Sequence, residues 1–87
     1  MRKLSRAEIQ TKAQEFLLEL RTPERQKEFE WVPELTNLME ELLVLAKQDK
    51  PNQAQVAELS GRIDAFVRRP RMKGVEYIQQ WVDSLSE

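Results

Sequence analysis

The segment PELTNLMEELLVLAKQ, residues 33–48, is the most apolar stretch of the 87-residue chain. On a helix with about 100° between successive residues, its apolar side chains cover an arc of about 160°, wider than a surface helix needs. These side chains are Leu35, Leu38, Met39, Leu42, Leu43, Leu45 and Ala46. A stripe this broad is typical of a helix that is contacted on two sides, so the segment predicts a central helix.

Narrower stripes on both sides of this segment predict two more long helices, at residues 6–21 and 53–69. The first stripe consists of Ile9, Ala13, Phe16, Leu17 and Leu20, and the second of Val56, Leu59, Ile63, Phe66 and Val67. Each falls within an arc of about 100°. Ser5 and Glu8 have the spacing of a capping box at the start of the first helix. Asn52 is a favourable N-cap for the other.

Two shorter helices are predicted at residues 23–31 and 75–85. Thr22 followed by Pro23 is a favourable helix start, because Thr caps the first turn and Pro loses no needed donor there. Pro33 is expected to push the preceding residue, Val32, away from helical dihedral angles and to break the chain between the second and third helices. The last helix would turn four side chains inward: Ile78, Trp81, Val82 and Leu85.

The sequence therefore predicts an all-α fold in one domain spanning residues 1–87. The architecture is a small antiparallel bundle of four principal helices plus one short helix, because the short connections favour antiparallel neighbours. No stretch alternates between polar and apolar residues for long enough to form a strand.

A helix-turn-helix within the fourth helix is an alternative, because Gly61 falls where the turn of that motif would lie. Three positions that the motif buries hold Ser60, Arg62 and Pro70, however. Leu59 and Ile63 instead complete the stripe of one continuous helix. We therefore favour a single helix with an internal glycine, which costs about 1 kcal/mol.

The composition excludes several kinds of chemistry. The chain has no Cys and no His, which removes disulfides, thiolate zinc sites, cysteine nucleophiles and the commonest general base. Its two glycines are too few for a phosphate-binding loop. The glutamates lie off the apolar stripes, as solvated surface carboxylates do. We expect no catalytic residues, no metal, no cofactor and no small-molecule substrate, and hence no enzyme.

The charge and hydropathy patterns indicate a cytoplasmic protein that does not enter a membrane. The 14 Lys and Arg residues nearly balance the 15 Asp and Glu residues, for a net charge of −1. The longest uninterrupted apolar run is 42–46, far short of the roughly 20 residues that span a bilayer. Polar residues also interrupt the apolar stretch that a signal peptide would need after its basic start.

A basic segment at residues 68–73 supports an alternative function, regulation through binding of nucleic acid. Its cations are Arg68, Arg69, Arg71 and Lys73. The i,i+4 spacing predicts that Arg68 pairs with Asp64, and that Arg62 pairs with Glu58. The other three cations of the segment have no evident local partner, so they are candidates for phosphate contacts.

Three apolar residues on the wrong side of their helices support the leading hypothesis, a protein-protein interaction. Leu18 lies about 180° from Ile9, and Val44 about 180° from Leu35, so both point away from the predicted core. Trp31 follows Phe29 by two residues, so the two rings cannot face the same core on one helix. We predict that an adaptor, inhibitor, assembly factor or accessory subunit uses Leu18, Trp31 or Val44 to bind another protein or a second copy of itself.

Overall fold

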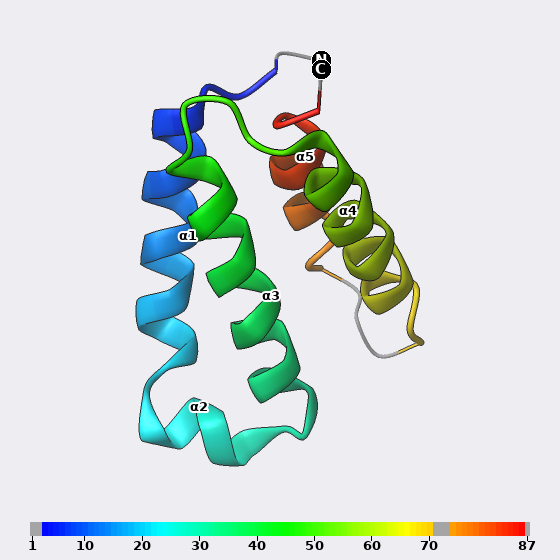
Figure 1. Cartoon of the computed structure of the whole chain (residues 1–87). Coiled ribbons are helices and arrows are strands. Elements are labelled where there is room, and N and C mark those ends of the chain that lie inside the picture. Colours follow the sequence, from blue (N-terminus) through cyan, green and yellow to red (C-terminus); the bar gives the residue numbers. More distant parts are fainter. Residues whose placement is uncertain (1–2, 71–73, 87) are drawn as a thin grey trace.

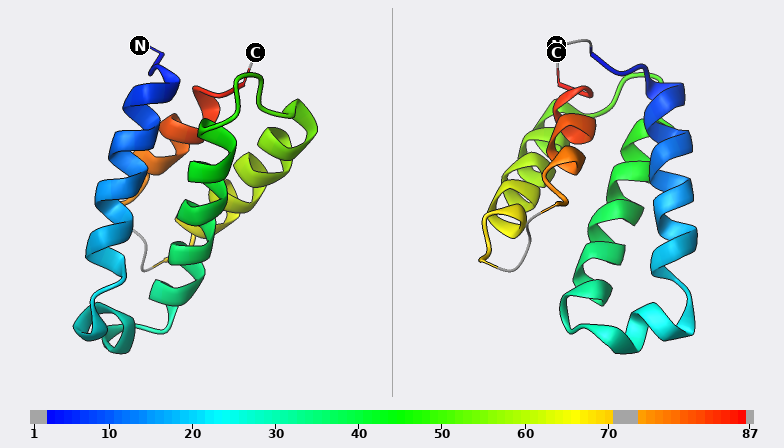
Figure 2. Two further views of the ribbon diagram at one scale, coloured as in Figure 1. Left: turned by 60° about the vertical axis from the view of Figure 1, so that its left-hand side comes forward. Right: turned by 180° about the vertical axis from the view of Figure 1, so that it is seen from behind.

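The computed structural model describes residues 3–70 and 74–86, and within these ranges the chain forms five helices and no strand (Figure 1). The helices are α1 (Arg6–Leu20), α2 (Pro23–Glu28), α3 (Trp31–Ala46), α4 (Gln53–Val67) and α5 (Tyr77–Asp83). The helices α1 and α3 lie side by side and antiparallel, with α2 crossing between their ends, and α4 and α5 form a second antiparallel pair (Figures 1 and 2). The predicted all-α antiparallel bundle of four principal helices and one short helix is confirmed.

The central position of α3 is also confirmed. It packs against α1 on one side and α4 on the other. Its buried apolar side chains are Val32, Leu35, Leu38, Met39, Leu42, Leu45 and Ala46. Of the predicted stripe only Leu43 is less than fully buried, and it still packs against the core. The wide apolar arc of α3 therefore faces two helices, α1 and α4, as its width indicates.

The predicted N-caps are present. The Ser5 Oγ accepts a hydrogen bond from the backbone N–H of Glu8 at 3.2 Å, and the Glu8 carboxylate accepts one from the Ser5 N–H at 3.4 Å. Thr22 caps α2, with Pro23 as its first residue. Asn52 caps α4 by accepting from two backbone amides of the first turn. These helix starts are determined locally, by side chains within three residues of the helix end.

The predicted break at Pro33 is wrong. Val32 and Pro33 both lie in the first turn of α3, and the actual break is at Phe29, whose backbone is extended with φ −139° and ψ 144°. A first-turn N–H has no acceptor within its own helix, so proline is tolerated there. The second helix therefore ends at Glu28 instead of residue 31, and the third begins at Trp31.

The other predicted helix ends are close to the observed ones. The first helix ends one residue earlier than predicted, at Leu20, and the fourth two residues earlier, at Val67. The fifth helix is two residues shorter at each end, at Tyr77–Asp83. Helix ends fray and shift by one or two residues without a change in the fold.

An aromatic cluster joins α1 to α5. The ring centroid of Phe16 lies 6.1 Å from that of Tyr77 and 6.0 Å from that of Trp81, and the latter two are 5.2 Å apart. Desolvation of Tyr77 in this cluster raises the pKa of its hydroxyl. Ring pairs at these separations add to the area that they bury, so the cluster fastens the short α5 to the long α1.

Gly61 provides a test of the continuous α4, and Gly74, which lies outside that helix, provides a contrast. Gly61 lies inside this helix, and a Cβ atom added there would meet no other atom within 4 Å. Because alanine is about 1 kcal/mol more favourable than glycine in a helix interior, Gly61→Ala is expected to raise the free energy of unfolding by about that amount. Gly74 has φ 97°, so Gly74→Ala is expected to lower it by about 1 kcal/mol.

Urea unfolding of the two variants, followed by circular dichroism, measures both effects. A loss of stability in Gly61→Ala would contradict the single helix, because a glycine at the turn of a helix-turn-helix would need the backbone conformation that alanine disfavours.

Candidate functional site

An open groove lies between α3 and α4. It has a volume of about 730 Å³. Its lining comes from the two helices alone: Asn37, Glu40, Glu41, Val44 and Leu45 from α3, and Gln55, Glu58, Leu59 and Arg62 from α4. We call this feature the α3–α4 groove.

The groove lies between two helices that pack against each other, α3 and α4. The loop at residues 47–52 joins the end of α3 to the start of α4 (Figure 2). Leu45 of α3 and Leu59 of α4 both line the groove, and both are almost fully buried, with 4% and 3% of their surface exposed. Val44 lies next to them, on the side of α3 that points away from the core, and 59% of it is exposed. Among the described residues that line the groove, Val44 is therefore the one apolar residue with a largely exposed side chain.

Apart from Val44, Leu45 and Leu59, the side chains that line the groove are polar or charged. The lining includes three carboxylates, on Glu40, Glu41 and Glu58, and one guanidinium, on Arg62. Arg62 forms an ion pair with Glu41 at 2.7 Å, and the hydrogen bond between them raises the pKa of Arg62. Glu40 forms an ion pair with Arg21 of α1 at 3.0 Å. The rim is therefore acidic, with two of its three carboxylates compensated.

The predicted pairing of Arg62 with Glu58 is not formed. Arg62 reaches across the groove to Glu41 of α3 instead of along its own helix. Glu58 takes part in no ion pair with any residue in the described ranges, although it is near enough to Arg62 to raise its pKa slightly. The local i,i+4 spacing is favourable, but the guanidinium pairs with a carboxylate on the neighbouring helix instead.

The structure does not bring the three predicted partner-binding residues together. Only Val44 lines the α3–α4 groove. Leu18 lies on α1 with 66% of its surface exposed, as the sequence predicts. Trp31 begins α3, about 20 Å along the helix from Val44 at 1.5 Å per residue. It is half-buried, and its ring stacks on that of Phe29 at 5.2 Å.

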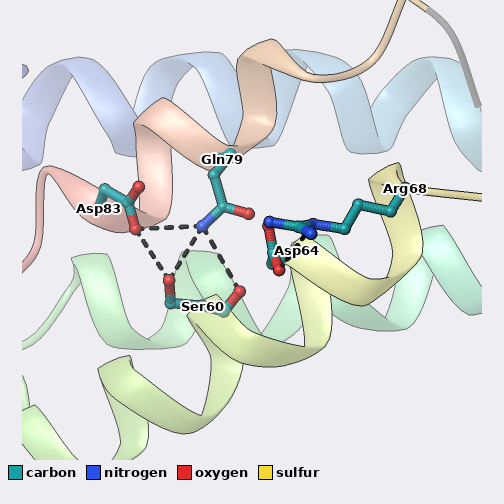
Figure 3. Close-up of polar contacts among 5 residues, drawn as sticks. All are labelled: Ser60, Asp64, Arg68, Gln79 and Asp83. Atoms are coloured by element: carbon teal, nitrogen blue, oxygen red, sulfur yellow. Dashed lines mark hydrogen bonds and ion pairs between the residues drawn. The ribbon is translucent and has the colours of Figure 1, made fainter.

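The cations at the end of α4 that the structure describes are paired. Arg68 forms the predicted ion pair with Asp64, at 3.0 Å (Figure 3). Arg69 forms two parallel hydrogen bonds with the carboxylate of Glu34, at 2.5 and 2.9 Å, and its guanidinium lies 4.9 Å above the ring of Phe66. The other two candidates for phosphate binding, Arg71 and Lys73, lie outside the described residues.

The pair of Glu34 and Arg69 predicts a pH dependence of stability. The hydrogen bond from Arg69 lowers the pKa of Glu34 below its ordinary value of 4.5. Since the folded-state pKa is the lower one, the pair stabilises the fold above the unfolded-state pKa, and this contribution is lost as the pH falls through the folded-state value. Glu34→Gln is therefore expected to be less stable than the wild type at pH 7 and equally stable in strong acid.

Urea unfolding at a series of pH values tests this difference, with Glu15→Gln as the control. The expected loss is modest, because about half of each side chain is exposed, 48% for Arg69 and 49% for Glu34. A constant difference between Glu34→Gln and the wild type at every pH would show that titration of Glu34 is not its cause.

A polar cluster of Ser60, Gln79 and Asp83 connects α4 with α5 (Figure 3). The Ser60 hydroxyl donates to the Asp83 carboxylate at 2.8 Å, and the Gln79 amide donates to both, at 2.9 and 3.1 Å. The Oε1 of Gln79 is buried without a hydrogen-bond partner among the described residues. The bonds from Ser60 to Asp83 and from Gln79 to Ser60 run between the two helices, so the cluster holds α5 against α4.

Neither metal-site geometry nor a membrane-spanning helix among the described residues, nor similarity to known proteins, indicates a function for this chain. No three His, Cys, Asp or Glu side chains in the described ranges lie together as a metal site requires. No helix in the same ranges has both the length and the apolar character needed to cross a membrane. No known protein family matches the chain, and neither a curated protein nor a solved structure matches it. The functional inference therefore depends on the chain's own residues.

Proposed function

We propose that this protein is a non-enzymatic binding module that holds a segment of another polypeptide in the α3–α4 groove. The observation that carries the proposal is the exposure of Val44 at 59%, beside the apolar side chains of Leu45 and Leu59 and within a charged rim. A small apolar centre with a polar surround is typical of protein interfaces.

The energetics support this use of the groove. Complete burial of a valine side chain contributes about 1.5–3 kcal/mol, and more than half of Val44 remains to be buried. The neighbouring leucines are already held in place by the core, so a partner would meet a preformed surface and order few side chains on binding. The absence of His and Cys from the chain is consistent with binding without catalysis, and the composition with a cytoplasmic location.

A matched pair of variants tests the proposal. Val44→Gln and Leu18→Gln each replace an exposed apolar residue by a neutral, helix-compatible one, but only Val44 lines the groove. Each protein is used as bait in an extract of the native host, and any captured protein is purified and mixed with the bait again. We expect binding that Val44→Gln weakens and Leu18→Gln leaves unchanged.

Two outcomes would contradict the proposal. The first is binding that is lost only in Leu18→Gln, which would move the interface to α1. The second is binding of DNA or RNA that persists in Val44→Gln, weakens steeply with salt and is lost in Arg69→Ala, which would favour a nucleic-acid regulator.

A further inference from the structure

We infer that the occupant of the α3–α4 groove is a basic amphipathic helix of a partner protein. This inference depends on the proposed function and adds the chemical class of the partner to it.

The backbone of the groove favours a helix as its occupant. Both walls are helices, whose peptide groups are hydrogen-bonded internally, and the described residues contain no strand whose edge could pair with an extended segment. A helix needs no such edge, because its peptide groups are hydrogen-bonded within the helix. A helix can also place its apolar stripe against the exposed side chain of Val44.

The dimensions of the groove fit a short helix. Its lining extends from Asn37 to Leu45 on α3 and from Gln55 to Arg62 on α4. At 1.5 Å per residue the α3 stretch is about 12 Å long and the α4 stretch about 10.5 Å, or about two helical turns each. A partner helix would present apolar residues at positions i, i+3 or i+4, and i+7 to this length of groove.

The charge of the rim favours a basic helix. Arg62 and Glu41 compensate each other at 2.7 Å, and Arg21 compensates Glu40 at 3.0 Å. Glu58 is left without an ion pair to any described residue, next to the apolar side chain of Leu59. A Lys or Arg beside the apolar stripe of the partner would therefore meet Glu58, whereas an acidic helix would meet a rim of its own sign.

Two synthetic peptides test this inference. Both are amphipathic helices of about four turns with leucine at the i, i+3, i+4 and i+7 spacing. One carries lysine at its polar positions and the other carries glutamate. Their binding is measured by fluorescence anisotropy against the whole protein and the variants Val44→Gln, Glu58→Gln and Glu15→Gln. A scrambled lysine peptide, with its leucines distributed around the helix, controls for attraction by charge alone.

We expect the ordered lysine peptide to bind at least about tenfold more tightly than the glutamate peptide, because like charges across an interface are costly. Its affinity should fall with added salt. Glu58→Gln should weaken binding about threefold to tenfold, Val44→Gln should weaken it further, and Glu15→Gln on α1 should leave it unchanged.

The possible failures are distinguishable. Equal binding of the lysine and glutamate peptides, with dependence on Val44, would overturn the basic partner and leave the binding module intact. Equal binding of the ordered and scrambled lysine peptides would overturn the amphipathic helix. Failure of every peptide, while a native partner is captured through Val44, would overturn this inference alone. Failure in both experiments would overturn the proposed function as well.

Discussion

Leu42→Ala is expected to lower the free energy of unfolding by about 2–5 kcal/mol, because it leaves a cavity in the core. Leu42 is fully buried on α3, the helix that contacts both α1 and α4. The same substitution at Leu18, which is 66% exposed, is expected to change stability by less than about 0.5 kcal/mol. The two variants lose the same atoms, so the difference between them reports burial alone.

Urea denaturation followed by circular dichroism measures this difference. The stability of a domain this small is of the order of 5–10 kcal/mol, so Leu42→Ala should unfold at a much lower urea concentration. Equal losses in the two variants would contradict the central position of α3.

Val44→Gln is expected to weaken binding of the groove's partner by about 2 kcal/mol, or about thirtyfold in the dissociation constant. The expected stability change is small, because Val44 is mostly exposed and glutamine has a slightly higher helix propensity than valine. Isothermal titration calorimetry with the ordered lysine peptide, or with a native partner once purified, measures the affinity. The matched variant Leu18→Gln should bind like the wild type. An affinity of Val44→Gln within twofold of the wild type would show that this valine is not at the interface.

The helices and the core could be predicted from the sequence because the signals that determine them are local. The apolar stripe of α3 identifies the central helix, and Ser5, Thr22 and Asn52 identify three helix starts. Each signal depends only on residues within a few turns of one another, where helical periodicity and capping act.

The position of the break between α2 and α3 could not be predicted in the same way. Proline is compatible with either a break or the first turn of a helix, and local preference does not distinguish them. In the folded protein Val32 is buried in the core, with 1% of its surface exposed. Tertiary burial of Val32 is consistent with a helix start that places Pro33 in the first turn.

The ion pairs between helices also could not be predicted. Glu34 and Arg69 are 35 residues apart, and Glu41 and Arg62 are 21 apart. Which of several exposed charges meet depends on how α3 and α4 cross, which the pattern of one helix does not specify. As a result, the sequence correctly predicts the pair of Asp64 and Arg68 but not the partners of Arg62 and Arg69.

The candidate site could be predicted only in part, because one of its walls carries a local signal in the sequence and the other does not. Val44 stands out as an apolar residue outside the stripe of its own helix, so the pattern of α3 alone identifies it. The groove beside Val44 has a second wall from α4, including Glu58 and Leu59. No feature of the sequence indicates that these two segments leave an open groove between them.

Methyl NMR of the whole protein, titrated with the ordered lysine peptide, tests the binding groove most directly. We predict that the methyl signals of Val44, Leu45 and Leu59 shift with the added peptide, while those of Leu18 do not. Saturable shifts at Leu18 with unchanged signals from the three groove residues would contradict it, because the peptide would then bind on α1.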